Sequence, residues 1–265
     1  MSMAVFMLSF PHMPRRSPLF DPASSEPFKL SRSKIELFVS CPRCFYLDRR
    51  FGIGRPPMPS FTLNNAVDAL MKKEFDIHRA AGSKHPLHKA YGLDLVPFAH
   101  EKVDEWRDSL RRGIQYVHKP SKFLVTGGID DVWMAPDGEL TIVDYKATSS
   151  ADEVTLESKW KFAYKRQMEI YQWLFRQNGF KVSKTGYFVY CNGTTDREAF
   201  DGKLEFDVTL LPYEGNDAWI PGALKAARAC LESEELPAAG AECEHCGYRA
   251  KARKVEKKVI TFNKD

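Results

Sequence analysis

The stretch KFLVTGGIDDVWMAPDGELTIVDYK, residues 122–146, decides the fold that the sequence predicts. Its two halves are apolar and rich in β-branched and aromatic residues, whereas Pro136-Asp137-Gly138 has the composition of a tight turn. We therefore expect a hairpin, with a first strand over 123–133 and a second strand over 140–145.

Four charged side chains interrupt this apolar hairpin. Asp130 and Asp131 lie in the first strand, and Asp144 and Lys146 lie near the end of the second. Side chains alternate between the two faces of a strand, so Asp144 and Lys146 point the same way. A two-residue loop would place Asp131 on the face of Asp144, whereas a three-residue loop with a bulge, or a bulge in either strand, would place Asp130 there.

These residue types suit the hydrolysis of a phosphodiester. Mg²⁺ prefers oxygen ligands and keeps several waters, so one or two carboxylates suffice to bind it. A bound cation polarises a phosphoryl oxygen and lowers the pKa of a bound water. A neighbouring lysine orients that water and offsets the negative charge that develops on the phosphorus group. Because Asp-x-Lys is a common pattern, surface charges on a hairpin remain the alternative interpretation of the pattern alone.

Composition limits the classes of protein. A chain of 265 residues that is 43% hydrophobic and 12% aromatic buries a substantial core, which favours one elaborated domain. The net charge of +4 is too small to indicate nucleic-acid binding through an overall electrostatic field. Six cysteines in a chain of this length do not suggest a disulfide-dense secreted domain. Apolar residues precede Arg15-Arg16, the reverse of a secretory signal, and no run approaches membrane-spanning length, so we expect a cytoplasmic protein.

The remaining chain divides into an arm, a domain and a tail. Residues 1–28 are rich in Pro, Ser and Met and are expected to be extended or disordered. Residues 29–250 form the domain, and 251–265 form a basic tail. A helix is expected from Ser31 or Ser33 towards Cys41, and the other expected elements are helices over 63–80, 97–110, 156–178 and 218–231 and strands over 187–191 and 204–211. This order predicts an α/β (α+β) fold with a mixed central sheet flanked by helices.

Three motifs occur in a fixed order: GxIDxV at 127–132, IVDYK at 142–146 and QxxxY at 167–171. Together they resemble the PD-(D/E)XK nuclease superfamily. The resemblance is to the RecB-like branch, which includes the nuclease domains of helicase-nucleases and the CRISPR-associated adaptation exonucleases. It runs from about residue 29 to residue 248 and implies a restriction-endonuclease-like core.

The resemblance also implies roles for individual residues. It assigns ligands of Mg²⁺ or Mn²⁺ and catalytic groups as follows: Asp130, Asp144 and the main-chain carbonyl of Tyr145 for the metal, and Lys146, Gln167 and Tyr171 for catalysis. Gln167 and Tyr171 are four residues apart and therefore share a helix face. Their alternative interpretation is the polar side of an amphipathic helix.

The preceding helix departs from the family pattern. The branch commonly carries Gly-x-x-x-His there, and its histidine ligates the metal, but the best match in this chain is NNAVD at 64–68. Asp68 is expected to supply an oxygen ligand instead, and Glu74 on the same helix is the alternative.

Two Cys-x-x-Cys pairs, Cys41/Cys44 and Cys243/Cys246, suit a four-thiolate site, because each pair presents two sulfurs from one turn. Joining them closes a loop of roughly 200 residues, which costs about 5 kcal/mol of conformational entropy. Metal–thiolate binding of roughly 10–16 kcal/mol offsets that cost. Several RecB-like proteins hold a 4Fe-4S cluster with one upstream and three downstream cysteines. The resemblance therefore implies such a cluster here, although the cysteines are divided two and two; zinc or free thiols are the alternatives.

The other cysteines and the histidine within the second pair have simpler interpretations. Cys191 and Cys230 are expected as small core residues. His245 is an alternative ligand, or a solvated side chain.

Basic and aromatic residues crowd the start of the long helical pattern before Gln167. Such a mixture binds a phosphate backbone and stacks bases, although Trp160 and Tyr164 at helical spacing also fit a core. Nucleic-acid contacts are predicted at Lys161, Lys165 and Arg166.

The expected function is a divalent-metal-dependent DNA nuclease, exonuclease-like on DNA ends or single strands, with DNA and other proteins of a DNA-processing complex as partners. Two alternatives remain. One is a non-catalytic nucleic-acid-binding module of the same fold, and the other is a phosphohydrolase that acts on a small substrate.

Overall fold

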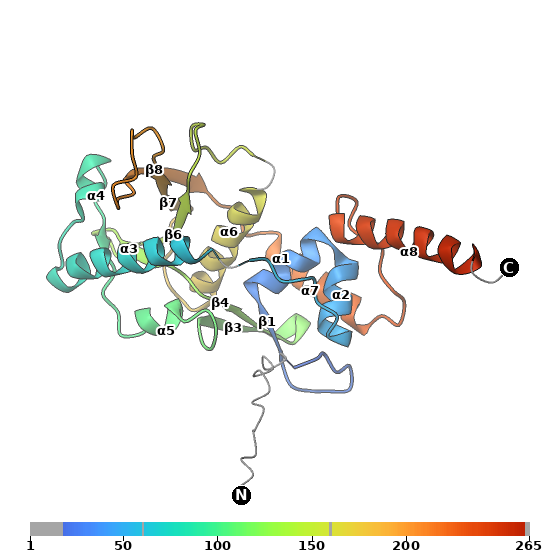
Figure 1. Cartoon of the computed structure of the whole chain (residues 1–265). Coiled ribbons are helices and arrows are strands. Elements are labelled where there is room, and N and C mark those ends of the chain that lie inside the picture. The colour runs from blue at the N-terminus through green and yellow to red at the C-terminus, as the bar shows by residue number, and fades with distance from the viewer. Residues whose placement is uncertain (1–17, 60, 159–160, 263–265) are drawn as a thin grey trace, which may run out of the picture.

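Two mixed sheets form the centre of the computed structural model, which describes residues 18–59, 61–158 and 161–262 (Figure 1). The first sheet has the order β1-β4-β3, from β1 (Phe28–Ser31), β4 (Phe123–Gly127) and β3 (Ile114–His118). The second has the order β2-β5-β6-β7-β8, from β2 (Val96–Pro97), β5 (Asp131–Met134), β6 (Leu140–Thr148), β7 (Thr185–Gly193) and β8 (Phe206–Glu214). The pairs β1–β4 and β6–β7 are parallel, and the other neighbours are antiparallel. The α/β class and the mixed pairing are thus confirmed, with two sheets where one was expected.

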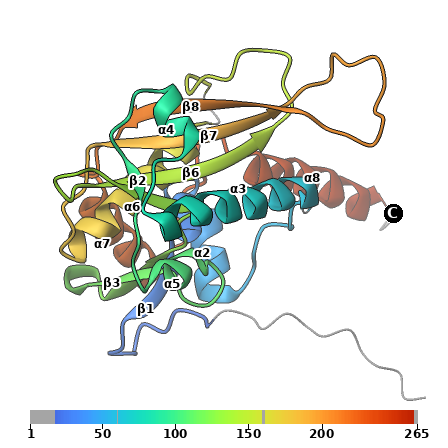
Figure 2. The same ribbon diagram turned by 90° about the vertical axis from the view of Figure 1, so that its left-hand side faces the viewer.

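Helices cover the sheets and separate them. The longer ones are α1 (Arg32–Ser40), α2 (Pro42–Phe51), α3 (Thr62–Ala81), α6 (Phe162–Gln177), α7 (Ile220–Glu232) and α8 (Glu244–Phe262). Short turns complete the chain at α4 (Pro86–Ala90), α5 (Val103–Arg107) and the 3₁₀ turn η1 (Lys119–Ser121). The helix α6 packs against β3 and β4 of one sheet and β6 of the other. On the far side of the five-stranded sheet, α3 lies along β6 (Figure 2).

The two faces of the five-stranded sheet bury different apolar clusters. The larger cluster includes Ile142 of β6, Met168 of α6 and Val125 of β4. The smaller one includes Phe75 of α3 and Trp133 of β5, whose rings stack with centroids 5.3 Å apart. Because β6 contributes to both clusters, it lies between α3 and α6. None of the described helices is both long and apolar enough to span a bilayer.

A three-residue loop, 136–138, closes the hairpin between β5 and β6. The N–H of Ala135 donates to the carbonyl of Glu139 at 2.9 Å, and Gly138 has a φ of 80°, which glycine adopts without strain. In this register Asp131 pairs with Val143. Of the two loop lengths considered from the sequence, the three-residue loop is the one that forms.

The single first strand expected over 123–133 is wrong, because the chain changes sheet within it. β4 pairs with β1 and β3, whereas β5 pairs with β6. Gly127 and Gly128 separate the two strands at a crowded place. A Cβ atom on Gly127 would lie 2.7 Å from the ring of Tyr171, and one on Gly128 would lie 2.6 Å from Cα of Ser109. Two residues without side chains allow the backbone to pass between these neighbours.

Two expected helices are shorter than the sequence suggested. The pattern over 97–110 forms only α5, because Pro97 pairs with Trp133 in extended conformation and the buried residues Val103 and Trp106 span a single turn. The pattern over 156–178 begins at Phe162, and the described residues 156–158 are not helical. The helices expected near 31–40, 63–80 and 218–231 and the strands near 187–191 and 204–211 are confirmed within a few residues.

Part of the expected arm lies outside the described residues, which begin at residue 18. The segment expected as a basic tail forms the last part of α8 up to residue 262. Figure 1 shows α8 projecting from the corner of the molecule where α1 and α2 lie.

Candidate active site and four-cysteine site

A cleft of about 630 Å³ opens between α3, the β5–β6 hairpin and α6. Asp68 comes from α3, Asp130 and Lys146 come from the hairpin, and Gln167 and Tyr171 come from α6. Three separate parts of the chain therefore bring the predicted side chains to one place.

Asp144 lies behind the cleft wall with no exposed surface. Gln167 Nε2 donates hydrogen bonds to Asp144 Oδ1 at 2.8 Å and to the Tyr171 hydroxyl oxygen at 3.1 Å. Lys146 Nζ forms an ion pair with Asp144 Oδ2, and this oxygen accepts no hydrogen bond from the described part of the chain. Asp144, Lys146, Gln167 and Tyr171 thus form one connected group.

Asp130 immediately precedes β5 and joins this group. Its Oδ2 accepts a 2.9 Å hydrogen bond from the N–H of Tyr145, and its Oδ1 lies 3.1 Å from Lys72 Nζ. The N–H and C=O of one residue in an extended strand point to the same side, so the Tyr145 carbonyl also faces this edge. Two residues further along β6, the carbonyl of Ala147 lies on the same edge and accepts a 2.8 Å hydrogen bond from Asn64 Nδ2.

Asp131 is enclosed beside the cleft and does not open into it. Its side chain has no exposed surface and accepts a 2.7 Å hydrogen bond from the Tyr145 hydroxyl. The guanidinium groups of Arg79 and Arg107 form ion pairs with the same carboxylate. The observed register therefore places Asp130, and not Asp131, beside Asp144.

We expect Asp131→Ala to lower the free energy of unfolding by about 3 kcal/mol, because Arg79 and Arg107 lose the buried one of their two carboxylate partners. Both half-buried guanidinium groups keep their ion pairs with Asp76. Urea unfolding followed by circular dichroism measures this loss. Asp207→Ala is the matched control, since Asp207 is exposed on β8; this control should change stability by about 0.5 kcal/mol or less. Equal stabilities of the two variants would contradict the structural role of Asp131.

Lys72 was not predicted from the sequence. Its ammonium lies 2.8 Å from Asp68 Oδ2 and 3.1 Å from Asp130 Oδ1, so it stands where a bound cation would be shared between carboxylates. The Asp68-x-x-x-Lys72 spacing on one helix face is the signal that would have found it. Glu74, the alternative upstream ligand, instead pairs with His85 Nε2 at 2.9 Å and is not part of the cleft wall.

Two other cleft residues were also not assigned to the metal site. Arg32, at the start of α1, lines the cleft, and its charge acts to lower the pKa values of Asp144 and Tyr171. Tyr164 lines it as well, with its ring centroid 4.6 Å from Lys146 Nζ. Trp160 lies outside the described residues.

The charges in the cleft influence one another strongly. Burial raises the pKa of Asp144 to about 6; Lys146 opposes this shift, and the charge of Asp130 adds to it. Burial also acts to raise the pKa of Asp130, but Lys72 and Lys146 outweigh it and hold the pKa below its usual range. The pKa of Asp68 is raised, by burial and then by the charge of Asp130. Crowded carboxylates of this kind are stabilised by a nearby cation.

This donor set fits a hard divalent cation. Carboxylate and carbonyl oxygens are the ligands that suit Mg²⁺ and Mn²⁺. Asp130, Asp144 and the Tyr145 carbonyl would hold the ion, with Asp68 available from α3.

The three predicted nucleic-acid contacts lie outside the cleft and are engaged with the protein. Lys161 is buried, and its ammonium contacts the carbonyl of Thr155. Arg166 donates two 2.7 Å hydrogen bonds to the carboxylate of Glu36. The Lys165 ammonium lies 5.5 and 5.7 Å from the centroids of two aromatic rings.

The four predicted cysteines form a second cluster, far from the first in sequence. Cys41 and Cys44 belong to the start of α2, and Cys243 and Cys246 to the start of α8. Their sulfur atoms all lie within 4.8 Å of one another. Cys191 and Cys230 are separate from this cluster: Cys191 is buried in the sheet, as expected, and Cys230 is half-buried.

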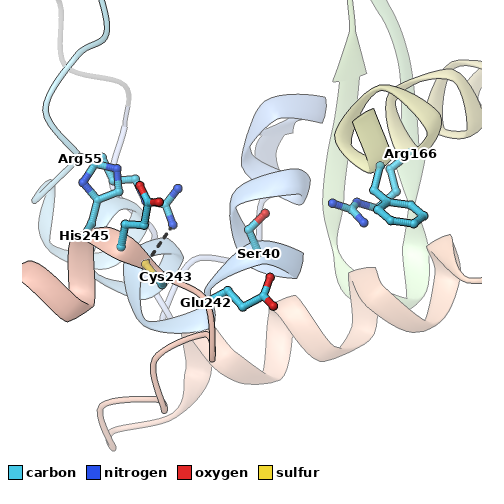
Figure 3. A pocket seen from close by; sticks show the side chains of 8 residues that line it. Ser40, Arg55, Arg166, Glu242, Cys243 and His245 are labelled. Atoms are coloured by element: carbon cyan, nitrogen blue, oxygen red, sulfur yellow. Dashed lines mark hydrogen bonds between the residues drawn. The ribbon is translucent and has the colours of Figure 1, made fainter. Parts of the chain in front are cut away.

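Polar groups surround these sulfurs. The N–H groups of Gly240 and Cys44 donate to Cys41 Sγ at 3.2 and 3.5 Å. Arg55 Nη2 donates to Cys243 Sγ at 3.4 Å, at the edge of a pocket of about 530 Å³ that His245 also lines (Figure 3). His245 is not one of the clustered ligands.

The thiols differ in their tendency to ionise. Burial acts to raise the pKa of Cys41, but the N–H groups of Gly240 and Cys44 outweigh it and bring the pKa to about 6. Burial, followed by the neighbouring sulfurs, raises the pKa of Cys246 to about 12. Several thiolates are therefore not accommodated together without a cation.

One comparison with known proteins agrees with the motifs. The sequence profile of the PD-(D/E)XK nuclease superfamily matches residues 29–251. The chain belongs to the PD-(D/E)XK nuclease superfamily. A comparison with curated proteins finds no match. Among solved structures, the crystal structure of SSO0001 aligns over 81% of each chain at 15% sequence identity with a TM-score of 0.33.

Proposed function

We propose that this PD-(D/E)XK protein is a divalent-metal-dependent DNA nuclease that hydrolyses phosphodiester bonds, in an exonuclease-like manner on DNA ends or single strands. The observation that carries the proposal is that Asp130, Lys146 and Gln167 line one cleft and that Asp144, directly behind its wall, contacts Lys146 and Gln167. The RecB-like branch is the assignment we favour, because Gln167 and Tyr171 on α6 complete this group.

Each side chain has a defined part in the proposed reaction. A divalent cation bound here would supply Lewis-acid activation of a phosphoryl oxygen and of a water. Asp130 and Asp144 hold their carboxylates at the edge of β6, where the carbonyl of Tyr145 joins them. Lys146 presents an ammonium group that orients the attacking water and offsets the charge of the transition state. Gln167 fixes the carboxylate of Asp144 by donating to its Oδ1.

A cleavage assay tests this proposal. Wild-type protein is incubated with 5′-labelled single-stranded and linear duplex DNA, and separately with covalently closed circular DNA that is stained after electrophoresis, with Mg²⁺ or Mn²⁺. We expect linear DNA to be shortened from its ends and circular DNA to persist. Fragments of mixed internal length from circular DNA would show that the protein acts as an endonuclease.

The alternative, a non-catalytic nucleic-acid-binding module, is favoured by two observations. Lys72 places a permanent positive charge between Asp68 and Asp130, and the upstream Gly-x-x-x-His pattern is replaced by NNAVD. A protein of this kind would bind DNA saturably in EDTA and would give no product with any divalent metal. This outcome would reject the nuclease proposal.

A further inference from the structure

The distances between the sulfur atoms of the four-cysteine cluster distinguish three possibilities. These are a disulfide, a single metal ion and an iron–sulfur cluster. Cys41 Sγ lies 3.7 Å from Cys246 Sγ, and Cys44 Sγ lies 3.6 Å from Cys243 Sγ and 3.7 Å from Cys246 Sγ. A disulfide is excluded, because its sulfurs are about 2.05 Å apart.

These distances match the coordination of one tetrahedral ion. Four thiolates bound to one Zn²⁺ at about 2.3 Å have sulfur–sulfur distances of about 3.8 Å, the edge of the tetrahedron. These three distances are within a few tenths of an ångström of this edge, and the other three pairs lie within 4.8 Å. One ion at the centre therefore reaches all four sulfurs after small adjustments of the side chains.

The same distances do not fit a 4Fe-4S cluster. In such a cluster each cysteine binds a different iron, so the width of the metal core separates the four sulfurs in addition to the metal–sulfur bonds. The cysteines described here lie too close together to surround a core of that size. The cluster implied by the resemblance to RecB-like proteins is therefore not supported by the residues present.

The surroundings are those of a closed structural site. Cys41, Cys44 and Cys246 are buried, and Cys243 is half-buried. Both pairs begin a helix, where backbone N–H groups favour negative charge on the sulfurs. The segment before the second pair also fits closely, because a Cβ atom on Gly240 would collide with the carbonyl oxygen of Ser40. A structural zinc site has four protein ligands and no open position, and the four clustered cysteines would supply all of these ligands.

We propose that the four cysteines bind one Zn²⁺ ion, which fastens the start of α8 to the start of α2. The zinc ion joins positions about 200 residues apart in sequence and fixes the direction in which α8 leaves the body of the molecule (Figure 1). The site is structural and separate from the carboxylate cleft, so its occupancy is measured independently of nuclease activity.

The test begins with the metal content of the full chain, purified without oxygen and without added metal. Elemental analysis is expected to give one zinc per chain, with iron and acid-labile sulfide below about 0.1 per chain. X-ray absorption at the zinc edge is expected to show a single shell of four sulfurs. Four irons and four sulfides per chain, or a folded chain that contains no metal, would overturn the proposal.

Matched variants locate the ion. Cys243→Ser is expected to lose the zinc or to bind it with one sulfur fewer, whereas Cys230→Ala, altered at a half-buried cysteine of α7, should keep one zinc. If Cys243→Ser does not fold, titration of the wild-type chain with a mercurial reagent replaces it. Release of one zinc as four thiols react supports the site, and zinc retained after all the accessible thiols have reacted contradicts it.

Discussion

Asp144→Asn is expected to lower the rate of DNA cleavage at least about 10³-fold while the chain remains folded. A metal ion supplies several kcal/mol of transition-state stabilisation, and about 4 kcal/mol corresponds to a factor of about 10³ in rate. The asparagine keeps an oxygen that accepts the hydrogen bond from Gln167 Nε2, which is 2.8 Å from Asp144 Oδ1. It removes the negative charge that would bind the ion in the proposed site.

The fold should tolerate this change for an electrostatic reason. Burial raises the pKa of Asp144 to about 6, which means that the ionised carboxylate is less stable in the folded chain than in the unfolded one. Removing its charge also relieves repulsion from Asp130. Single-turnover cleavage and thermal unfolding are measured on the same preparation, with Asp207→Asn as the control. An Asp144→Asn protein that cleaves at the wild-type rate would show that this carboxylate has no part in the reaction.

Removal of the ion from the cysteine site is expected to cause the largest change in stability. Metal–thiolate binding contributes roughly 10–16 kcal/mol, and closing the long loop costs about 5 kcal/mol. The net loss is therefore at least about 5 kcal/mol, which corresponds to a fall in Tm of about 10–20 °C in a chain of this size. The start of α2 and all of α8 should lose protection from hydrogen exchange first.

This prediction is checked by differential scanning calorimetry and hydrogen exchange before and after treatment with a strong thiol-competing chelator. Restoring one equivalent of Zn²⁺ should restore the original Tm, and one equivalent of Mg²⁺ should not. A Tm that does not change after complete loss of zinc would contradict a fastening role for the ion.

The active-site hairpin illustrates how much of the structure was predictable. The turn residues at 136–138 predicted the hairpin, and the alternation of side chains placed Asp144 and Lys146 together. The sequence left open whether Asp130 or Asp131 joins them, because one residue of loop length reverses the face of every side chain. The Ala135–Glu139 hydrogen bond decides this register in the structure.

Other features depend on tertiary contacts that local patterns do not contain. Gly127 and Gly128 mark the change of sheet between β4 and β5, but their need to avoid Tyr171 and Ser109 becomes visible only when those residues are packed around them. Lys72 approaches Asp130 from a helix 58 residues away in sequence. For the same reason, Arg166 was expected to bind a phosphate backbone, and Glu36 was not identified as its partner.

The cysteines show the same limit at the level of chemistry. Two Cys-x-x-Cys pairs predicted a four-thiolate site, and the sulfurs do lie together. The spacing along the chain does not define the distances between the sulfurs. Those distances, 3.6–3.7 Å for three pairs, favour one tetrahedral ion over the cluster that the family resemblance implied.

The most direct test of the central claim compares wild-type protein with Lys146→Ala in DNA cleavage as Mn²⁺ is titrated from zero, with EDTA as the metal-free reference. Lys181→Ala is the control, since Lys181 is exposed and pairs with Asp137 at the hairpin loop. We predict saturable, metal-dependent cleavage by the wild-type and control proteins and a rate about 10²–10³-fold lower for Lys146→Ala. Cleavage that persists in EDTA, or that is equally fast in Lys146→Ala, would contradict a metal-dependent site in this cleft.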